Sequence, residues 1–165
     1  MSALCRFPLL ALAVAGCAHP PPAPPPPDEA RWLLDRPAEE RFVRVAAHLR
    51  GLDVAMAETG YRYAELHWAG VDRNWDLASY QLGKIELTLA RGLERRPKRA
   101  ASAKLFEGPV AVLRQALAAR DGAAFDQAFA GLTASCNACH EAEQVGFMRV
   151  APPAVRTSVL SALPR

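Results

Sequence analysis

The stretch from Phe125 to Cys139 constrains the fold of this chain more than any other. Its buried-type side chains recur at steps of 4, 3, 4 and 3 residues, at Phe125, Phe129, Leu132, Cys136 and Cys139. This is the period of one face of an α-helix. Asp121 precedes the stretch as a good N-cap, and Gly146 follows it at a position suited to end a helix. We therefore expect two cysteines on the buried stripe of a long helix.

Three further segments show helical periodicity, and none shows the alternation of a β-strand. The first covers residues 38–67 or slightly more, with a kink or break at Gly60. The second begins at residues 72–74 and ends just before Pro97, which cannot continue a helix. The third covers residues 103–120, or only its part after Pro109. The sequence predicts an all-α fold, an antiparallel four-helix bundle with short connections.

The N-terminus predicts an export signal that ends at a lipid attachment site. Arg6 provides a positive start, and residues 7–15 form an apolar run too short for a membrane span. Val-Ala-Gly-Cys at residues 14–17 resembles the lipobox of bacterial lipoproteins, in which the cysteine, here Cys17, carries lipid. Ordinary cleavage close to this cysteine is the alternative. The proline-rich residues 19–30 are suited to hold a domain away from a bilayer.

These features predict four parts. They are a signal peptide (1–16), a lipidated Cys17 with a proline-rich linker (17–34), a helical domain (35–150) and a tail (151–165) with a short helix from Pro152. The protein is then expected in the periplasm, held by its lipid on a bacterial membrane. The formal net charge is only +3, which is too weak to indicate a nucleic-acid partner.

The run Cys136-Asn137-Ala138-Cys139-His140 allows three chemistries. Thiol–disulfide exchange normally uses an exposed Cys-x-x-Cys at a helix start in a βαβ setting, whereas this pair comes late in a helix. Structural zinc needs four ligands, and the remaining histidines stand at no recognisable zinc spacing. Covalent haem attachment needs two thiols one helical turn apart and an adjacent imidazole as axial ligand. We favour haem, with zinc and a redox dithiol as the alternatives.

With these residues at the end of the last helix, the chain resembles the class II c-type cytochromes, which are cytochrome c′-like four-helix bundles. Residues 69–86 (AGVDRNWDLASYQLGKIE) and 132–150 (LTASCNACHEAEQVGFMRV) are similar to small exported bacterial monohaem proteins. The resemblance implies one covalent haem c, attached on the C-terminal bundle helix through Cys136 and Cys139, with His140 as fifth iron ligand.

The chain departs from the cytochrome c′ pattern just after the haem motif. Those proteins commonly carry a basic residue about one turn beyond the histidine, where this chain has Gln144, preceded by Glu141 and Glu143. Carboxylates around the axial histidine would favour ferric iron and lower the reduction potential.

A sixth iron ligand would separate electron transfer from ligand binding. Met56 resembles the position from which some class II cytochromes supply a thioether, although a methionine on an apolar stripe is also ordinary core filler. His67 and Met148 are further candidates, the first also readable as a surface residue and the second as apolar cover beside Phe147. Two aromatic residues, Trp75 and Phe129, are candidates for the wall of the haem pocket, with core packing remote from the haem as the equal alternative.

Together these patterns predict a membrane-tethered monohaem cytochrome, not an enzyme, that passes single electrons between redox proteins of the cell envelope. It would act as a monomer or a homodimer. The alternative from another class is a haem protein that binds a diatomic gas at an open sixth position.

Overall fold

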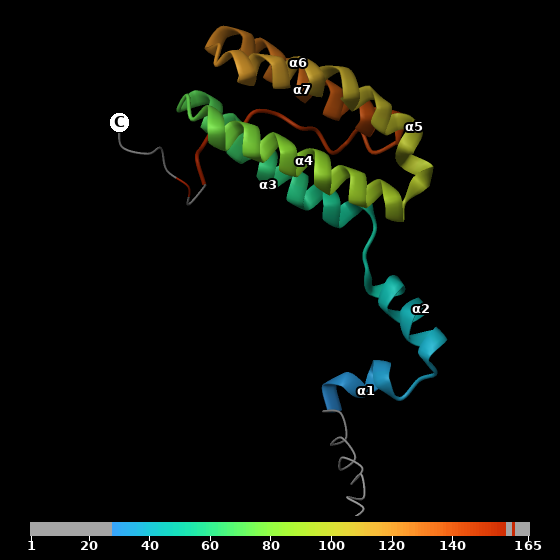
Figure 1. Cartoon of the computed structure of the whole chain (residues 1–165). Coiled ribbons are helices and arrows are strands. Elements are labelled where there is room, and N and C mark those ends of the chain that lie inside the picture. The colour runs from blue at the N-terminus through green and yellow to red at the C-terminus, as the bar shows by residue number, and fades with distance from the viewer. Residues whose placement is uncertain (1–27, 158–159, 161–165) are drawn as a thin grey trace, which may run out of the picture. The chain divides into compact units, whose positions relative to one another are not determined.

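The computed structural model describes residues 28–157 and residue 160. The chain divides into two compact units, Met1–Ala46 and Ala47–Arg165. Among the described residues every regular element is a helix, and none is a β-strand (Figure 1). The all-α prediction is confirmed. The predicted signal peptide and Cys17 lie outside the described residues.

The first unit contains α1 (Asp28–Leu34) and most of α2 (Ala38–His48). Pro37 separates the two helices and stands just before α2, where its lack of an N–H does no harm. Two acids, Glu39 and Glu40, occupy the first turn of α2, where the helix dipole favours negative charge.

The prediction of one helix over residues 38–67 is wrong. Helix α2 ends at His48, and a new helix, α3 (Leu52–Val71), begins after Gly51, which is its N-cap in extended conformation. Gly60, the expected break, lies inside α3 with open space around it. A single glycine there lowers the stability of the helix by only about 0.5–1 kcal/mol, so the helix formed by the flanking residues continues across it.

The second unit is built around two helical hairpins. Helix α3 is followed by α4 (Trp75–Arg95), and α6 (Glu107–Ala119) is followed by α7 (Gly122–Ala142). Within each hairpin the two helices pack closely, and across hairpins α4 contacts α6 while α3 contacts α7 (Figure 1). The span predicted for α4 and the start predicted for α7 agree with the structure. Helix α6 ends as predicted but begins at Glu107, between the two predicted starts.

Short polar turns set both hairpins. The turn into α4 has Arg73 in the left-handed region at φ 58°, and Asn74 then accepts a hydrogen bond from the Leu77 N–H at 3.2 Å. The turn into α7 has Arg120 at φ 53°, and Asp121 accepts hydrogen bonds from the first amides of α7. The predicted N-cap Asp121 is confirmed, and of the predicted start residues 72–74 it is Asn74 that caps α4.

The two hairpins are joined by a chain of short helices. These are the 3₁₀ turn η1 (Pro97–Arg99), α5 (Ala100–Ala103) and the 3₁₀ turn η2 (Lys104–Phe106). Pro97 ends α4 as expected, because its ring prevents continuation of the helix. The short helices stack on one end of the unit, where η2 and α5 contact α7.

The core lies between the hairpins and consists of apolar side chains from all four long helices. Its fully buried large members are Leu66, Leu82, Ile85, Leu113, Phe125 and Leu132. Helices α3 and α7 come close together at Gly70, where an added Cβ would stand 1.9 Å from the Phe125 ring. Helices α3 and α7 can therefore meet here only because residue 70 lacks a side chain.

Two expectations for the C-terminus are wrong. Helix α7 ends at Ala142, and the left-handed residue beyond it is Gln144, at φ 61°, and not Gly146. Residues 151–157 form no helix, so the helix expected from Pro152 is not found in the described part of the tail. The tail instead runs back along the hairpins (Figure 1), and Arg156 forms a two-pronged ion pair with Asp72 at 2.6 and 2.7 Å.

Candidate functional site

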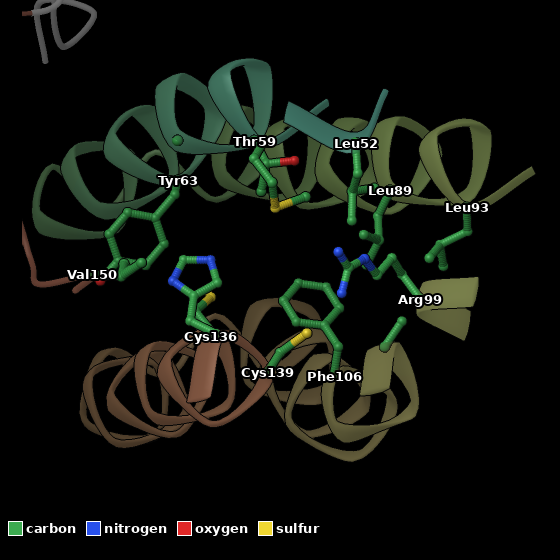
Figure 2. A pocket seen from close by; sticks show the side chains of 14 residues that line it. Leu52, Thr59, Tyr63, Leu89, Leu93, Arg99, Phe106, Cys136, Cys139 and Val150 are labelled. Carbon is green, nitrogen blue, oxygen red and sulfur yellow. The ribbon is translucent and has the colours of Figure 1, made fainter. Parts of the chain in front are cut away.

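The second unit encloses an apolar cavity of about 110 Å³ at the end where the short helices stack. Its walls come from the first half of α3, the last half of α4, the segment η1–η2 and the last turns of α7 (Figure 2). Val150 of the tail closes another side. The cavity therefore lies where residues from five distant parts of the sequence meet.

All three residues singled out in the Cys-x-x-Cys-His run line this cavity. Cys136, Cys139 and His140 lie in the last two turns of α7 and are half-buried, and both cysteines are free thiols. Spacings of three and four residues put side chains on one face of a helix, which explains why they share the cavity. Figure 2 shows Cys136 and Cys139 on α7 across from α3.

The thiols are held in their neutral form. Burial, aided by the neighbouring Cys139, raises the pKa of the Cys136 thiol to about 11. Burial also raises the pKa of Cys139, although the positive charge of Arg99 acts in the opposite direction. A thiol–disulfide exchange centre needs a lowered pKa on its attacking cysteine. The electrostatics of this pair are those of buried thiols and not of a reactive dithiol.

His140 has one ring nitrogen occupied. Its Nδ1 lies 2.6 Å from the carbonyl oxygen of Met148, so Nδ1 carries the proton and donates it to that oxygen. In the neutral imidazole with this tautomer, Nε2 is the nitrogen that carries the lone pair. Metal-binding histidines usually donate the N–H of the ring nitrogen that does not bind the metal to such an acceptor, which orients the ring.

The first spacer residue of the motif holds the tail against α7. The Asn137 amide donates to the Val150 carbonyl oxygen at 2.9 Å and accepts from the Val150 N–H at 2.8 Å. This pair of bonds fixes the backbone just after Met148. The segment that orients His140 is therefore itself anchored to the motif's own helix.

The opposite wall comes from α3. Met56, Thr59 and Tyr63 follow one another at helical spacing and line the cavity. Tyr63 stacks on Phe129 and donates to Thr133 Oγ1 at 2.7 Å, since that hydroxyl gives its own proton to the Phe129 carbonyl. The Thr59 hydroxyl is buried and finds no hydrogen-bond partner among the described residues.

The cavity contains one cationic side chain. Among the described residues that line it, Arg99 alone carries a permanent charge, and Figure 2 shows it pointing inward beside Phe106. Arg99 forms an ion pair with Glu143, the C-cap of α7. Glu141 is exposed and lies 3.7 Å from Arg149. The two carboxylates expected to surround His140 with negative charge are thus each beside an arginine.

The remaining sequence candidates lie elsewhere. His67 packs against Phe129 and Trp68, and burial lowers its pKa. At 1.5 Å rise per residue it stands about 16 Å along α3 from Met56. Phe129 is a core residue, and Trp75 packs edge-on against Phe125, so neither lines the cavity.

Two residues after the motif are also outside the cavity. Phe147 is 82% exposed and Met148 is 50% exposed, and neither lines the wall. The expected apolar cover beside the motif is supplied by Val150 instead. Of the three sixth-ligand candidates, the cavity brings only Met56 together with His140.

Sequence reasoning missed Thr59, Arg99, Asn137 and Val150. Thr59 could have been found, because it follows Met56 by three residues on the same helical face. The other three carry no periodic signal. Arg99 reaches the cavity from a 3₁₀ turn, and the Asn137–Val150 pair depends on the path of the tail.

Comparisons with protein-family models, curated proteins and solved structures found no match for this chain. Within the described residues, no three or more His, Cys, Asp or Glu side chains gather closely enough to hold a bare metal ion. Every helix in the described ranges falls short of the combined length and hydrophobicity that a membrane span requires.

Proposed function

We propose that this protein is an exported monohaem c-type cytochrome that transfers single electrons. In this proposal Cys136 and Cys139 form thioether bonds to one haem c, and His140 is its fifth iron ligand through Nε2. The observation that carries the proposal is that these three residues line one apolar cavity while the Met148 carbonyl occupies Nδ1 of the imidazole.

The residues present fit a haem in chemistry. The walls are apolar, the thiols are neutral and one helical turn apart, and one imidazole nitrogen is free. The cavity of about 110 Å³ is smaller than a porphyrin, so binding requires the side chains that project inward, Arg99 and Phe106, to give way. Both come from the short segment η1–η2 and not from a long core helix.

We further propose that α3, α4, α6 and α7 form an antiparallel four-helix bundle of the class II cytochrome type. The two hairpins with tight turns, and the contacts of α4 with α6 and α3 with α7, support this architecture. The haem would attach on α7, the C-terminal bundle helix, and lie toward α3.

The chain's own residues have separable roles in this mechanism. The bound iron supplies the chemistry by gaining and losing one electron. His140 is held in one tautomer by Met148, whose backbone is fixed by the Asn137–Val150 pair. The apolar wall excludes water from the iron, and Met56 is the candidate that can complete the coordination from α3. No bond of a substrate is made or broken, so the protein is not an enzyme in this proposal.

The setting of the protein is also proposed. A signal peptide would direct export, lipid on Cys17 would tether the protein in the periplasm, and the proline-rich linker would hold the haem domain off the membrane. Its partners would be redox proteins of the envelope, with no nucleic acid, and the protein could form a homodimer.

An absorption spectrum of the full chain, secreted by a host with an intact haem-ligation pathway, tests the proposal. We expect a c-type spectrum that survives denaturation, because thioether bonds are covalent. The His140→Ala variant should keep the haem mass but lose the wild-type axial signature. Colourless wild-type protein with two titratable thiols would refute the proposal.

A second function, binding of a diatomic gas, is favoured by one observation. The Thr59 hydroxyl is buried on the same wall as Met56 without a partner among the described residues, and it could donate to a small ligand on the iron. Carbon monoxide distinguishes the two functions. Rapid stoichiometric binding to the reduced protein supports the gas binder, and no binding supports a Met56-ligated electron carrier.

A further inference from the structure

Arg99 is an unusual member of the cavity wall. The other described lining residues are apolar or uncharged, apart from the titratable cysteines and histidine of the motif. A guanidinium directed into such a space costs free energy unless an anion accompanies it. Here the anion is Glu143.

Glu143 is itself poorly placed without Arg99. It is the C-cap of α7, and the negative end of a helix dipole disfavours a carboxylate there. The Glu143 side chain is only 14% exposed, so water can solvate its charge only weakly. The Arg99 side chain, in contrast, is 46% exposed. The pair therefore consists of a buried acid and a long, partly solvated arm that reaches over the cavity.

Arg99 also lies close to the motif. Its charge is felt at the Cys139 thiol, where it opposes the effect of burial on the pKa. Because Arg99 is the last residue of the three-residue turn η1, its side chain can redirect without displacing α4 or α7. The guanidinium of Arg99 is therefore placed to meet a carboxylate group of a ligand that enters the cavity.

We propose that Arg99 is the carboxylate-binding residue of the cavity, and that Glu143 takes the ligand's place until the ligand arrives. This inference rests on the proposed function: the ligand is haem, and the carboxylates are its two propionates. On binding, Arg99 exchanges the Glu143 carboxylate for a propionate. An arginine suits this exchange because its planar guanidinium can form paired hydrogen bonds with the carboxylate of Glu143 or with that of a propionate.

The test distinguishes the contribution of the porphyrin's carboxylates to affinity from the contribution of its apolar ring. The full chain carrying Cys136→Ser and Cys139→Ser cannot form thioether bonds, and its affinities for haem and for haem dimethyl ester are measured by titration. We expect haem to bind about tenfold more tightly than the ester, the ratio expected for one charge-assisted pair. Adding Arg99→Gln should reduce this ratio to near one, and Arg99→Lys should keep part of it.

Lys98→Gln is the matched control. Lys98 is the preceding residue on the same turn, is exposed and does not line the cavity. Its replacement by glutamine removes the same charge as Arg99→Gln. It should leave the preference for haem over its ester unchanged. Glu143→Gln should increase the preference, because the competing carboxylate is gone.

The outcomes are distinguishable. If haem and ester bind equally before and after Arg99→Gln, or if Lys98→Gln lowers the ratio as much, the role of Arg99 is refuted while the haem proposal stands. If neither porphyrin binds and the wild-type protein carries no covalent haem, the proposed function fails, and the role of Arg99 fails with it.

Discussion

At the scale of single residues, the Cys-x-x-Cys-His run does more than present three side chains. Its spacer Asn137 anchors the tail at Val150, and the anchored tail supplies the carbonyl that holds His140. The motif therefore includes part of its own supporting structure. Replacing the spacer would disturb the histidine without touching any residue that reaches the cavity from another helix.

The thiol of Cys136 should be slow to react in protein made without haem. Its pKa of about 11 means that it stays protonated until pH rises well above the ordinary thiol range, and only the thiolate attacks iodoacetamide, displacing iodide. At pH 8 we expect alkylation about a hundredfold slower than in the urea-unfolded chain, since two pKa units change the thiolate fraction by that factor. The rate should climb toward pH 11.

Peptide mass spectrometry after timed alkylation measures each cysteine separately. The unfolded chain is the control, because both cysteines lose their burial there. Equal rates for folded and unfolded Cys136 at pH 8 would contradict the buried-thiol description and would reopen the redox-dithiol alternative.

At the scale of helices, local signals predicted some boundaries well and others badly. Asn74 and Asp121 are strong N-caps, and the helices after them begin as expected. Gly51 is a weaker signal, so periodicity on both sides of it suggested one continuous helix. Beyond α7, Gln144 adopts the left-handed conformation that glycine usually takes. Local hydrogen bonds close the helix end there, from the Gln144 N–H to the Glu141 carbonyl at 3.0 Å and from the Val145 N–H to the His140 carbonyl at 2.8 Å. The preference for glycine at such a position therefore pointed to the wrong residue.

Packing between helices depends on small residues at specific points, which gives a second prediction. Gly70→Ala should destabilise the protein by about 2–3 kcal/mol, because the new Cβ would stand 1.9 Å from Phe125, whose ring is fully buried and cannot move aside. Gly83→Ala is the control: residue 83 lies inside α4 with open space around it. It should stabilise the protein by about 0.5–1 kcal/mol.

Urea unfolding of both variants in the same haem state measures the difference. A Gly70→Ala protein as stable as the wild type would mean that α3 and α7 do not approach as described. Loss of stability in both variants would instead point to a general intolerance of α3 and α4 to substitution.

At the scale of the whole molecule, the core and the cavity share one set of helices. The middle of the hairpins is filled by apolar side chains, whereas the end near η1–η2 has a space bordered by Cys136, Cys139 and Met56. A ligand that fills this space binds the folded chain and not the unfolded one, so it raises the free energy of unfolding by mass action.

If that ligand is the proposed haem, protein made without haem should melt at least about 5 °C below haem-loaded protein, which corresponds to roughly 1 kcal/mol for a domain of this size. Calorimetry of the two forms at equal concentration and pH measures this difference. Equal melting temperatures would contradict a structural contribution of the ligand. A variant with both cysteines replaced by serine and no added haem should melt like the haem-free form.

The sequence alone determined the helical class, the capped starts of α4 and α7, and the placement of Cys136 and Cys139 on one helical face. These features are local, because hydrogen bonds and side-chain periodicity within about four residues produce them. Periodicity identifies a helix face but not a level along the helix axis. His67, Trp75 and Phe129 face inward, yet the structure puts them outside the cavity wall. Only the packing of α3 against α7 decided that Met56 and Thr59 meet the motif, and only the path of the segment η1–η2 brought Arg99 there.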